Sequence, residues 1–137
     1  MAMQIWILNA STIGEIEAAF ATMARERPDA LFVPPDSFFF SRHVQITTLA
    51  ARERIAAVYS TRDYVAAGGL MSYGTDNADR YRQIGVYTGK ILNGTKPADL
   101  PVLQPTKFEF VINLGTARAL GIEVPETLLA TADEVIQ

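Results

Sequence analysis

Short apolar runs alternate with longer amphipathic segments along the chain. A compact apolar run between turn residues predicts a strand, and apolar residues spaced three and four apart predict a helix. The strands predicted in this way lie at residues 5–8, 30–33, 55–59, 70–72 and 108–112. The predicted helices begin near residues 12 and 41, span 61–67 and 78–92, and end the chain as two short segments at 116–120 and 125–130.

The first predicted helix has clear signals at both ends. Thr12 and Glu15 have the spacing of a capping box, in which each side chain satisfies a backbone amide of the other residue. Ile16 and Phe20 lie one turn apart and begin an apolar face, and Pro28 ends the helix. The pattern therefore predicts an amphipathic helix that packs one side on a sheet.

Strands and helices that alternate in this way predict an α/β fold with a mostly parallel sheet between two layers of helices. This three-layer sandwich is the Rossmann-like or flavodoxin-like architecture. The chain has 137 residues, which is the size of one domain. A connector at residues 97–105 contains Pro97, Pro101 and Pro105, and we expect it to be a hinge or a crossing between lobes.

Composition limits the classes of function. The net charge is -3 and the pI is near 5.1, which argues against a nucleic-acid partner because such modules usually carry a basic face. No apolar run is long enough to span a membrane. The start lacks the basic end and cleavage site of a signal peptide, so either the protein is cytoplasmic or a leader is missing from this sequence. Cysteines, metal-binding motifs and dinucleotide fingerprints are absent, so we expect no metal and no cofactor.

In an open parallel sheet, ligands bind beyond the carboxyl ends of the strands. This rule selects the loops at residues 9–12, 34–38, 60–63 and 72–77. Asp36 is the sharpest candidate, because it follows a buried strand and two stiffening prolines. It has two interpretations. Either its carboxylate accepts hydrogen bonds from a ligand ammonium or hydroxyl group, or Asp36 or Ser37 only stabilises a turn or caps the next helix.

Two further loops carry polar or aromatic side chains. Ser60 follows the third strand, where we expect Thr61 to cap the next helix. Arg62 either reaches a carboxylate or, as is more common, is solvated. Ser72 and Tyr73 follow the fourth predicted strand. Tyr73 either stacks on an apolar or aromatic ligand or is an ordinary half-buried tyrosine.

The sequence lacks the groups of a catalytic site. His43 is the only histidine, and no cysteine or GxSxG serine accompanies it as a nucleophile. We therefore expect His43 to lie on the surface and the protein not to be an enzyme. The aromatic run Phe38–Phe40 cannot face one core, so we expect one or two of its rings to cover a cleft or a partner surface.

The order and spacing of several segments resemble the substrate-binding proteins of ABC transporters, in the type I periplasmic-binding-protein class. Within this class the chain is most similar to the family that includes tryptophan- and phenylalanine-binding proteins. The matching segments, which cover most of residues 12–137, are Glu15–Met23 (EIEAAFATM), Asp29–Asp36 (DALFVPPD), Leu49–Tyr59, Tyr64–Gly74 (YVAAGGLMSYG), Gly89–Pro101 (GKILNGTKPADLP) and Phe108–Gly121 (FEFVINLGTARALG).

The resemblance implies a protein of two α/β lobes with the ligand between them. Residues 3–137 resemble the second, carboxyl-terminal lobe, with residues 73–105 as a helix and connector that cross between the lobes. The first lobe has no counterpart here. Neither does the first strand-helix unit of the second lobe, whose strand lies at the centre of the family's sheet. We therefore expect the isolated chain to cover its apolar surface by self-association into a homo-oligomer, with exchanged elements as one route.

The resemblance also assigns residues to the ligand site. Asp36 matches the acidic position after a strand of the second lobe and would hold a ligand amino group. Ser72 and Tyr73 match the loop that faces the cleft, and Ser60 lies in the neighbouring loop. Gly69 matches a glycine that lets the backbone approach the ligand or the hinge.

The sequence departs from the family beside this acidic position. Relatives often carry Asp-Asn where this chain has Asp36 between Pro35 and Ser37. Ser37 therefore joins Asp36 among the ligand-binding candidates, and the type of ligand stays open.

The function that the resemblance implies is that of the solute-binding component of an ABC-type importer. The protein would capture a small organic solute, such as an amino acid, between two lobes, and the membrane permease would recognise the closed state. A periplasmic or lipid-anchored extracytoplasmic location follows for the full-length protein. The alternative is a cytoplasmic sensor or regulatory domain of the same fold that binds a small effector, which an upstream helix-turn-helix would favour.

Overall fold

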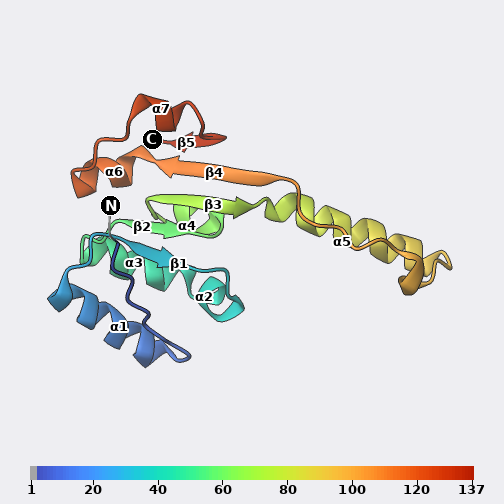
Figure 1. The fold of residues 1–137 in the computed structure, drawn as a ribbon, viewed down its shortest axis with the longest axis horizontal. Coiled ribbons are helices and arrows are strands. Elements are labelled where there is room, and N and C mark those ends of the chain that lie inside the picture. The colour runs from blue at the N-terminus through green and yellow to red at the C-terminus, as the bar shows by residue number, and fades with distance from the viewer. Residues whose placement is uncertain (1–2) are drawn as a thin grey trace.

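A computed structural model describes residues 3–137 as an α/β body from which one long arm projects (Figure 1). The helices are α1 (Ile13–Glu26), α2 (Ser37–Ser41), α3 (His43–Arg52), α4 (Arg62–Ala66), α5 (Asn77–Leu92), α6 (Leu114–Leu120) and α7 (Glu126–Leu129), with a 3-10 turn η1 at Pro97–Asp99. The strands are β1 (Leu31–Val33), β2 (Ala57–Tyr59), β3 (Met71–Thr75), β4 (Phe108–Asn113) and β5 (Glu134–Ile136).

The strands form one sheet in the order β1-β2-β3-β4-β5. Strands β1, β2 and β3 are parallel, β4 runs antiparallel to β3, and β5 is parallel to β4. The predicted α/β fold with a mostly parallel sheet is therefore confirmed. Strand β5 was not predicted, because its short segment Glu134–Ile136 carries little apolar pattern of its own.

Helix α1 forms as the sequence predicts. The Thr12 hydroxyl accepts from the Glu15 amide at 3.2 Å, and the Glu15 carboxylate accepts from the Thr12 amide at 3.1 Å. This capping box satisfies two amides that have no partner inside the helix. Ile16, Phe20 and Met23 are buried on one face, which binds the helix to the core.

The main core lies on one face of the sheet. The apolar side chains of α1, α3 and α4 pack there with Val33 of β1 and with Ala57 and Tyr59 of β2. In β4, the neighbouring residues Val111 and Ile112 point to opposite faces, and both are fully buried. Both faces are therefore covered at β4.

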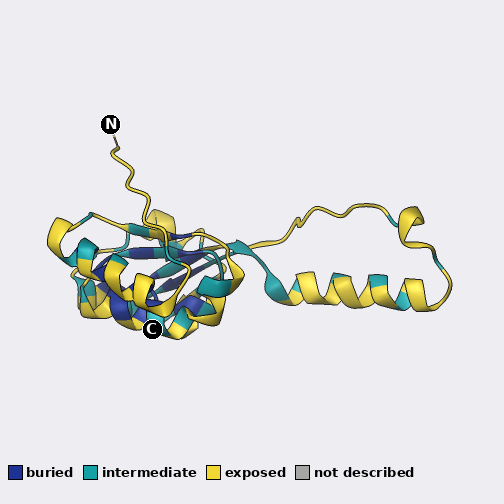
Figure 2. Ribbon diagram, turned by 90° about the horizontal axis from the view of Figure 1, so that it is seen from below, coloured by how far each residue is buried: buried dark blue, intermediate teal, exposed yellow. Residues whose placement is uncertain are grey.

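The second face is open at the β1 end of the sheet. Phe32 lies between the partly buried Leu31 and the buried Val33, so its ring points to the opposite face, where it is 63% exposed. Figure 2 shows the helices gathered on one side of the sheet and the amino-terminal segment leading away from the body. An uncovered apolar position in a parallel sheet is unusual, because such sheets are normally covered on both faces.

The prediction of a buried strand at Ile5–Leu8 was wrong. Residues 3–10 have no regular secondary structure, and Ile5 and Ile7 are 75% and 81% exposed. Composition favours a strand here, but a strand also needs a neighbour to take its backbone hydrogen bonds. No strand among residues 3–137 pairs with this segment.

Two predicted boundaries also need correction. The helix expected from Ser41 begins at His43, because the preceding residues Ser37–Ser41 form the separate helix α2. The strand expected at 70–72 continues to Thr75, since β4 pairs with β3 along its whole length. Ser72 and Tyr73 therefore lie inside a strand, not in a loop.

The arm consists of α5 and the connector that follows it. Asp76 caps α5 by accepting from the Ala78 and Asp79 amides at 2.8 and 3.1 Å. The connector returns along the helix, where the Tyr87 hydroxyl donates to the Pro101 carbonyl at 2.5 Å (Figure 1). No residue of α5 is buried, so the arm has no contact with the core that would account for its stability.

Candidate functional site

The carboxyl ends of β1, β2 and β3 meet at one edge of the sheet. Pro34 follows β1, Ser60 follows β2, and Asp76 follows β3. The arm starts at the same edge, where β3 leads into α5. This is the edge at which open parallel sheets bind ligands.

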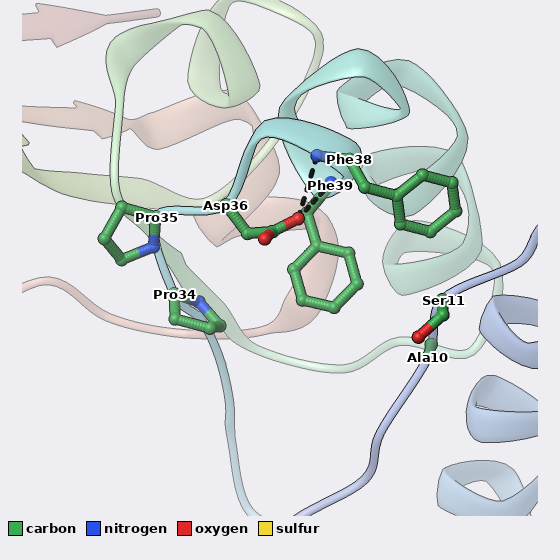
Figure 3. A pocket seen from close by; sticks show the side chains of 7 residues that line it. All are labelled: Ala10, Ser11, Pro34, Pro35, Asp36, Phe38 and Phe39. Atoms are coloured by element: carbon green, nitrogen blue, oxygen red, sulfur yellow. Dashed lines mark hydrogen bonds between the residues drawn. The ribbon is translucent and has the colours of Figure 1, made fainter.

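Asp36 caps helix α2 at this edge. Its Oδ1 accepts from the backbone amides of Phe38 and Phe39 at 2.8 and 3.0 Å, as Figure 3 shows. The capping interpretation of Asp36 is thus confirmed. Both hydrogen bonds go to a single oxygen, and the residue is exposed, so the cap leaves Oδ2 available for a ligand donor.

A cavity of about 430 Å³ lies beside Asp36. Its lining residues come from two segments and are Ala10, Ser11, Pro34, Pro35, Asp36, Phe38 and Phe39 (Figure 3). The rings of Phe38 and Phe39 are 6.0 Å apart. Ligand sites are commonly clefts of roughly 300–1,000 Å³ that combine apolar walls with a few polar groups. A carboxylate beside two aromatic rings fits this description, and the expectation that part of the aromatic run covers a cleft is confirmed.

Ser37 and Ser60 lie at the same edge but do not line this cavity. Ser37 is the exposed first residue of α2. Ser60 is partly buried and touches the neighbouring strand through its backbone. A Cβ placed on Gly74 would lie 1.9 Å from the Ser60 carbonyl oxygen, so only glycine fits there. Sequence reasoning missed Gly74, because nothing local to it signals this close approach.

Ser72 and Tyr73 point to opposite faces of β3. Ser72 is 1% exposed, and its Oγ has no hydrogen-bond partner among residues 3–137. Tyr73 is 60% exposed and stacks on Phe108 at 5.8 Å, with Phe110 edge-on at 6.3 Å. Tyr73 is thus an exposed aromatic side chain at the base of the arm and not the ordinary half-buried tyrosine of the alternative interpretation.

Gly69 lies at the opposite, amino-terminal end of β3. A Cβ there would lie 2.6 Å from the Tyr59 ring and 2.8 Å from the Tyr64 carbonyl oxygen. The close approach at Gly69 is therefore to the core. Of the six candidate residues, only Asp36 lines the cavity, and the ligand-binding roles of all six stay predictions.

Charges near the edge are already paired. Arg62 lies 2.6 Å from Glu134 and 3.5 Å from Glu109 with 44% of its side chain exposed, so it is ion-paired as well as solvated. The hydrogen bond from Arg62 to Glu134 raises the pKa of Arg62, and burial raises the pKa of Glu109 despite the nearby guanidinium. With two carboxylates beside it, Arg62 is a poor candidate for binding an anionic ligand group.

Tyr64 lies behind the capped turn. Burial, together with the carboxylates of Asp36 and Asp63, raises the pKa of Tyr64 to about 12. Its ring stacks on Tyr59 at 4.7 Å and meets His43 edge-on at 5.9 Å. His43 is therefore partly covered, and its Nδ1 lies 2.9 Å from the Phe40 carbonyl oxygen. Tyr59, Tyr64 and His43 thus pack together beside α2, and none of the three is a strong nucleophile.

Two kinds of feature are absent from residues 3–137. No group of three or more acidic, histidine or cysteine side chains is placed to bind a metal ion. No helix in this range combines the length and the apolar character that a membrane span requires.

Comparison with known proteins gives consistent results. A family model described as ABC transporter substrate binding protein matches residues 1–136. The tyrosine-binding protein of Clostridioides difficile strain R20291 is 27% identical over 117 residues, which are 82% of this chain and 32% of that protein.

Two crystal structures extend this comparison. An ABC domain in complex with L-Trp from Streptococcus pneumonia is 32% identical, with a TM-score of 0.81 over 90% of this chain and 42% of that one. A conserved domain protein from Vibrio cholerae O1 biovar El Tor strain N16961 is 27% identical, with a TM-score of 0.80 over 89% and 41% of the two chains. The chain thus spans less than half the length of each of these relatives. Because the family model matches nearly every residue and the L-Trp-bound domain shares its fold, this chain belongs to the ABC transporter substrate-binding proteins.

Proposed function

We propose that this chain is the second lobe of a solute-binding protein that captures an amino acid for an ABC importer. The observation that carries the proposal is the cavity that Asp36, Phe38 and Phe39 line together, at a carboxylate with one oxygen that is not used for capping. A carboxylate binds an ammonium group, and aromatic rings bind an apolar or aromatic side chain. The relatives named for tyrosine and L-Trp support an aromatic amino acid as the ligand.

In this two-lobed protein, the cavity beside Asp36 would be one half of the amino-acid site. The cavity is open to solvent. The chain covers only 41% and 42% of the two solved structures that resemble it. A first lobe would close over the Asp36 edge, and residues 73–105 would cross to it. The closed state would be the one that a membrane permease recognises, outside the cytoplasm.

A half site predicts weak binding. Titration calorimetry of L-tryptophan or L-tyrosine into this chain should show no binding at micromolar concentrations, because half of the contacts are missing. A two-lobed version of the protein should bind at micromolar concentrations or better. Nanomolar binding by this chain alone would contradict the half-site proposal.

The charge of Asp36 can be tested apart from its cap. Asp36→Asn keeps an oxygen that caps α2 about as well, so the stability of the fold should hardly change. The loss of charge should weaken amino-acid binding to a two-lobed version by about tenfold or more, because a charge-assisted hydrogen bond is lost. Asp36→Ala, the matched control, should lose the cap as well and cost about 1 kcal/mol of folding stability. Equal affinities of Asp36→Asn and the unchanged protein would reject the ammonium-binding role.

We also propose that the chain self-associates when no first lobe is present. Large apolar side chains are exposed both in the amino-terminal segment and along the arm, among them Ile7 at 81%, Leu92 at 81% and Val102 at 96%. Exposed apolar surface of this extent usually marks an interface. Sedimentation velocity over a range of concentrations tests this part of the proposal, and a monomer at every concentration would reject it.

A further inference from the structure

Three elements of the body meet through the side chain of Arg62. Arg62 is the first residue of α4, Glu109 lies near the start of β4, and Glu134 is the first residue of β5. The Arg62 Nη2 donates to the Glu134 Oε2 at 2.6 Å, whereas the Arg62 Nε lies 3.5 Å from the Glu109 Oε1. The short hydrogen bond therefore goes to Glu134, and Glu109 receives only a longer ionic contact.

Glu109 lies where the arm leaves the body. It pairs with Gly74 across β3 and β4, and this pair precedes the last pair of the two strands, Thr75 with Phe108. Strand β3 runs from here into α5, and the connector returns here to β4 (Figure 1). The side chain of Glu109 is 27% exposed, against 39% for Glu134. Glu109 is thus the more buried of the two carboxylates and has the weaker contact with Arg62.

Carboxylates outnumber cations around Glu109. Asp76 follows β3, Asp133 precedes β5, and Glu134 begins β5. Burial raises the pKa of Glu109, and these three carboxylates raise it further, against the opposing effect of Arg62. The geometry and the electrostatics therefore agree that the charge of Glu109 is poorly compensated.

The remaining charged groups nearby do not remove this excess. On α4, Asp63 adds another carboxylate that acts on Arg62. Lys107, two residues before Glu109, lies 3.8 Å from Asp79 of α5. The ionised form of Glu109 is therefore less favourable in the folded chain than in the unfolded chain.

We propose that Glu109 is a proton-sensitive contact that tightens the base of the arm when its surroundings become acidic. Uptake of one proton removes the repulsion from the neighbouring carboxylates and leaves the hydrogen bond from Arg62 to Glu134 in place. Strands β3 and β4 then hold more firmly at the pair of Gly74 and Glu109. The inference does not depend on amino-acid binding beside Asp36.

Glu109→Gln removes the charge and keeps the shape of the side chain. In the parent, the gain in stability is absent above the folded-state pKa of Glu109 and grows as the pH falls through it. The gain is complete below 4.5, the ordinary pKa of a glutamate. Urea denaturation at neutral pH should therefore give Glu109→Gln a smaller unfolding constant than the parent, and the two constants should converge as the pH falls to 4.5.

Glu134→Gln is the matched control, because it removes the same charge from beside the same guanidinium. This variant weakens the hydrogen bond from Arg62, so its unfolding constant at neutral pH should be larger than that of the parent. Equal stabilisation by both variants would show general charge repulsion in an acidic chain and would overturn the role of Glu109.

Two measurements on the parent locate the effect at the arm. NMR of the Glu109 side-chain carboxyl should give a titration midpoint above 4.5. The Asp76 amide donates to the Lys107 carbonyl at 3.1 Å, and its hydrogen-exchange protection factor should rise over the same pH range in the parent but not in Glu109→Gln. A midpoint at or below 4.5, or Asp76 protection that does not follow the titration, would overturn the proposal. Calorimetry of amino-acid binding tests the proposed function separately.

Discussion

Gly74 sets how closely β2 and β3 approach at the edge that carries the cavity. The methyl group of an alanine there would lie 1.9 Å from the Ser60 carbonyl oxygen. That atom belongs to the backbone and cannot move without separating the two strands. The residue thus links the geometry of the Ser60 turn to the base of the arm, since β3 ends one residue later at Thr75.

Gly74→Ala should destabilise the fold by about 2 kcal/mol or more, because overpacking next to the backbone forces the strands apart. Gly85→Ala is the matched control. Gly85 lies inside α5 with no atom within 4 Å of the added methyl group, so alanine should stabilise that helix by about 1 kcal/mol. Urea denaturation of both variants measures the difference. A Gly74→Ala protein as stable as the parent would show that β2 and β3 can separate at little cost.

Asp36 caps a helix with one carboxylate oxygen, and its other oxygen is not used by the cap. Its Oδ1 holds the first turn of α2, and this cap places Phe38 and Phe39 on the cavity. The two prolines before it stiffen the approach from β1. The cap fixes the direction of the carboxylate, which is the property that a binding group needs.

At the scale of elements, the arm differs from α1 and α3, the two helices that pack most extensively on the core. Helix α5 spans Asn77–Leu92 without a buried residue, whereas α1 and α3 each bury three or more. The arm is held by its Asp76 cap, by the Asp79–Arg82 ion pair at 2.6 Å and by the contact of Tyr87 with the connector. Surface ion pairs and caps contribute little compared with packing.

The arm should therefore be the first part of the chain to open. Limited trypsin digestion should cut first at Lys90, which is exposed in the last turn of α5, because proteases act on exposed, locally unfolded segments. Arg62 is the internal control, since ion pairs with Glu109 and Glu134 hold it against the body. Mass spectrometry of the early products reports the order of cleavage. Early cleavage at Arg62 would contradict this ranking of local stability.

At the scale of the whole molecule, the body and the arm are separable. Strands β3 and β4 pair from Met71↔Ile112 to Thr75↔Phe108, and the Asp76 amide donates to the Lys107 carbonyl at 3.1 Å. The arm is thus an insertion at the tip of a β-hairpin. The core that holds the sheet together, from Ile16 to Tyr64, contains no arm residue.

Replacing residues 77–106 by Asn-Gly tests this separation. The two residues form a tight turn that suits antiparallel strands closed by Asp76 and Lys107. The shortened chain should fold with the same sheet, and its thermal midpoint should lie within about 5 °C of the parent, because no buried contact is removed. Circular dichroism during heating measures the midpoint. A shortened chain that fails to fold would show that the arm stabilises the body through contacts that burial does not reveal.

The sequence alone determined the features that depend on neighbouring residues. The capping box of Thr12 and Glu15, the apolar face of α1 and the helix of the arm were all predicted, because their signals lie within one or two turns of helix. The apolar runs at β1, β2 and β4 likewise indicated strands. The cap of Asp36 was one of two local interpretations, and the hydrogen bonds confirm the cap while the ligand-binding role stays a prediction.

Tertiary structure decided the features that depend on a partner distant in sequence. Ile5–Leu8 has a strand's composition but stays exposed, because no strand among residues 3–137 lies beside it. Tyr73, Gly74 and Thr75 lie inside β3 and not in a loop, because β4 extends the pairing past the predicted strand end at residue 72. Gly74 requires glycine because the carbonyl of Ser60, the residue after β2, approaches it closely. Composition indicates which secondary structure a segment favours. The segment forms that structure only where the rest of the fold supplies partners for its hydrogen bonds and contacts for its side chains.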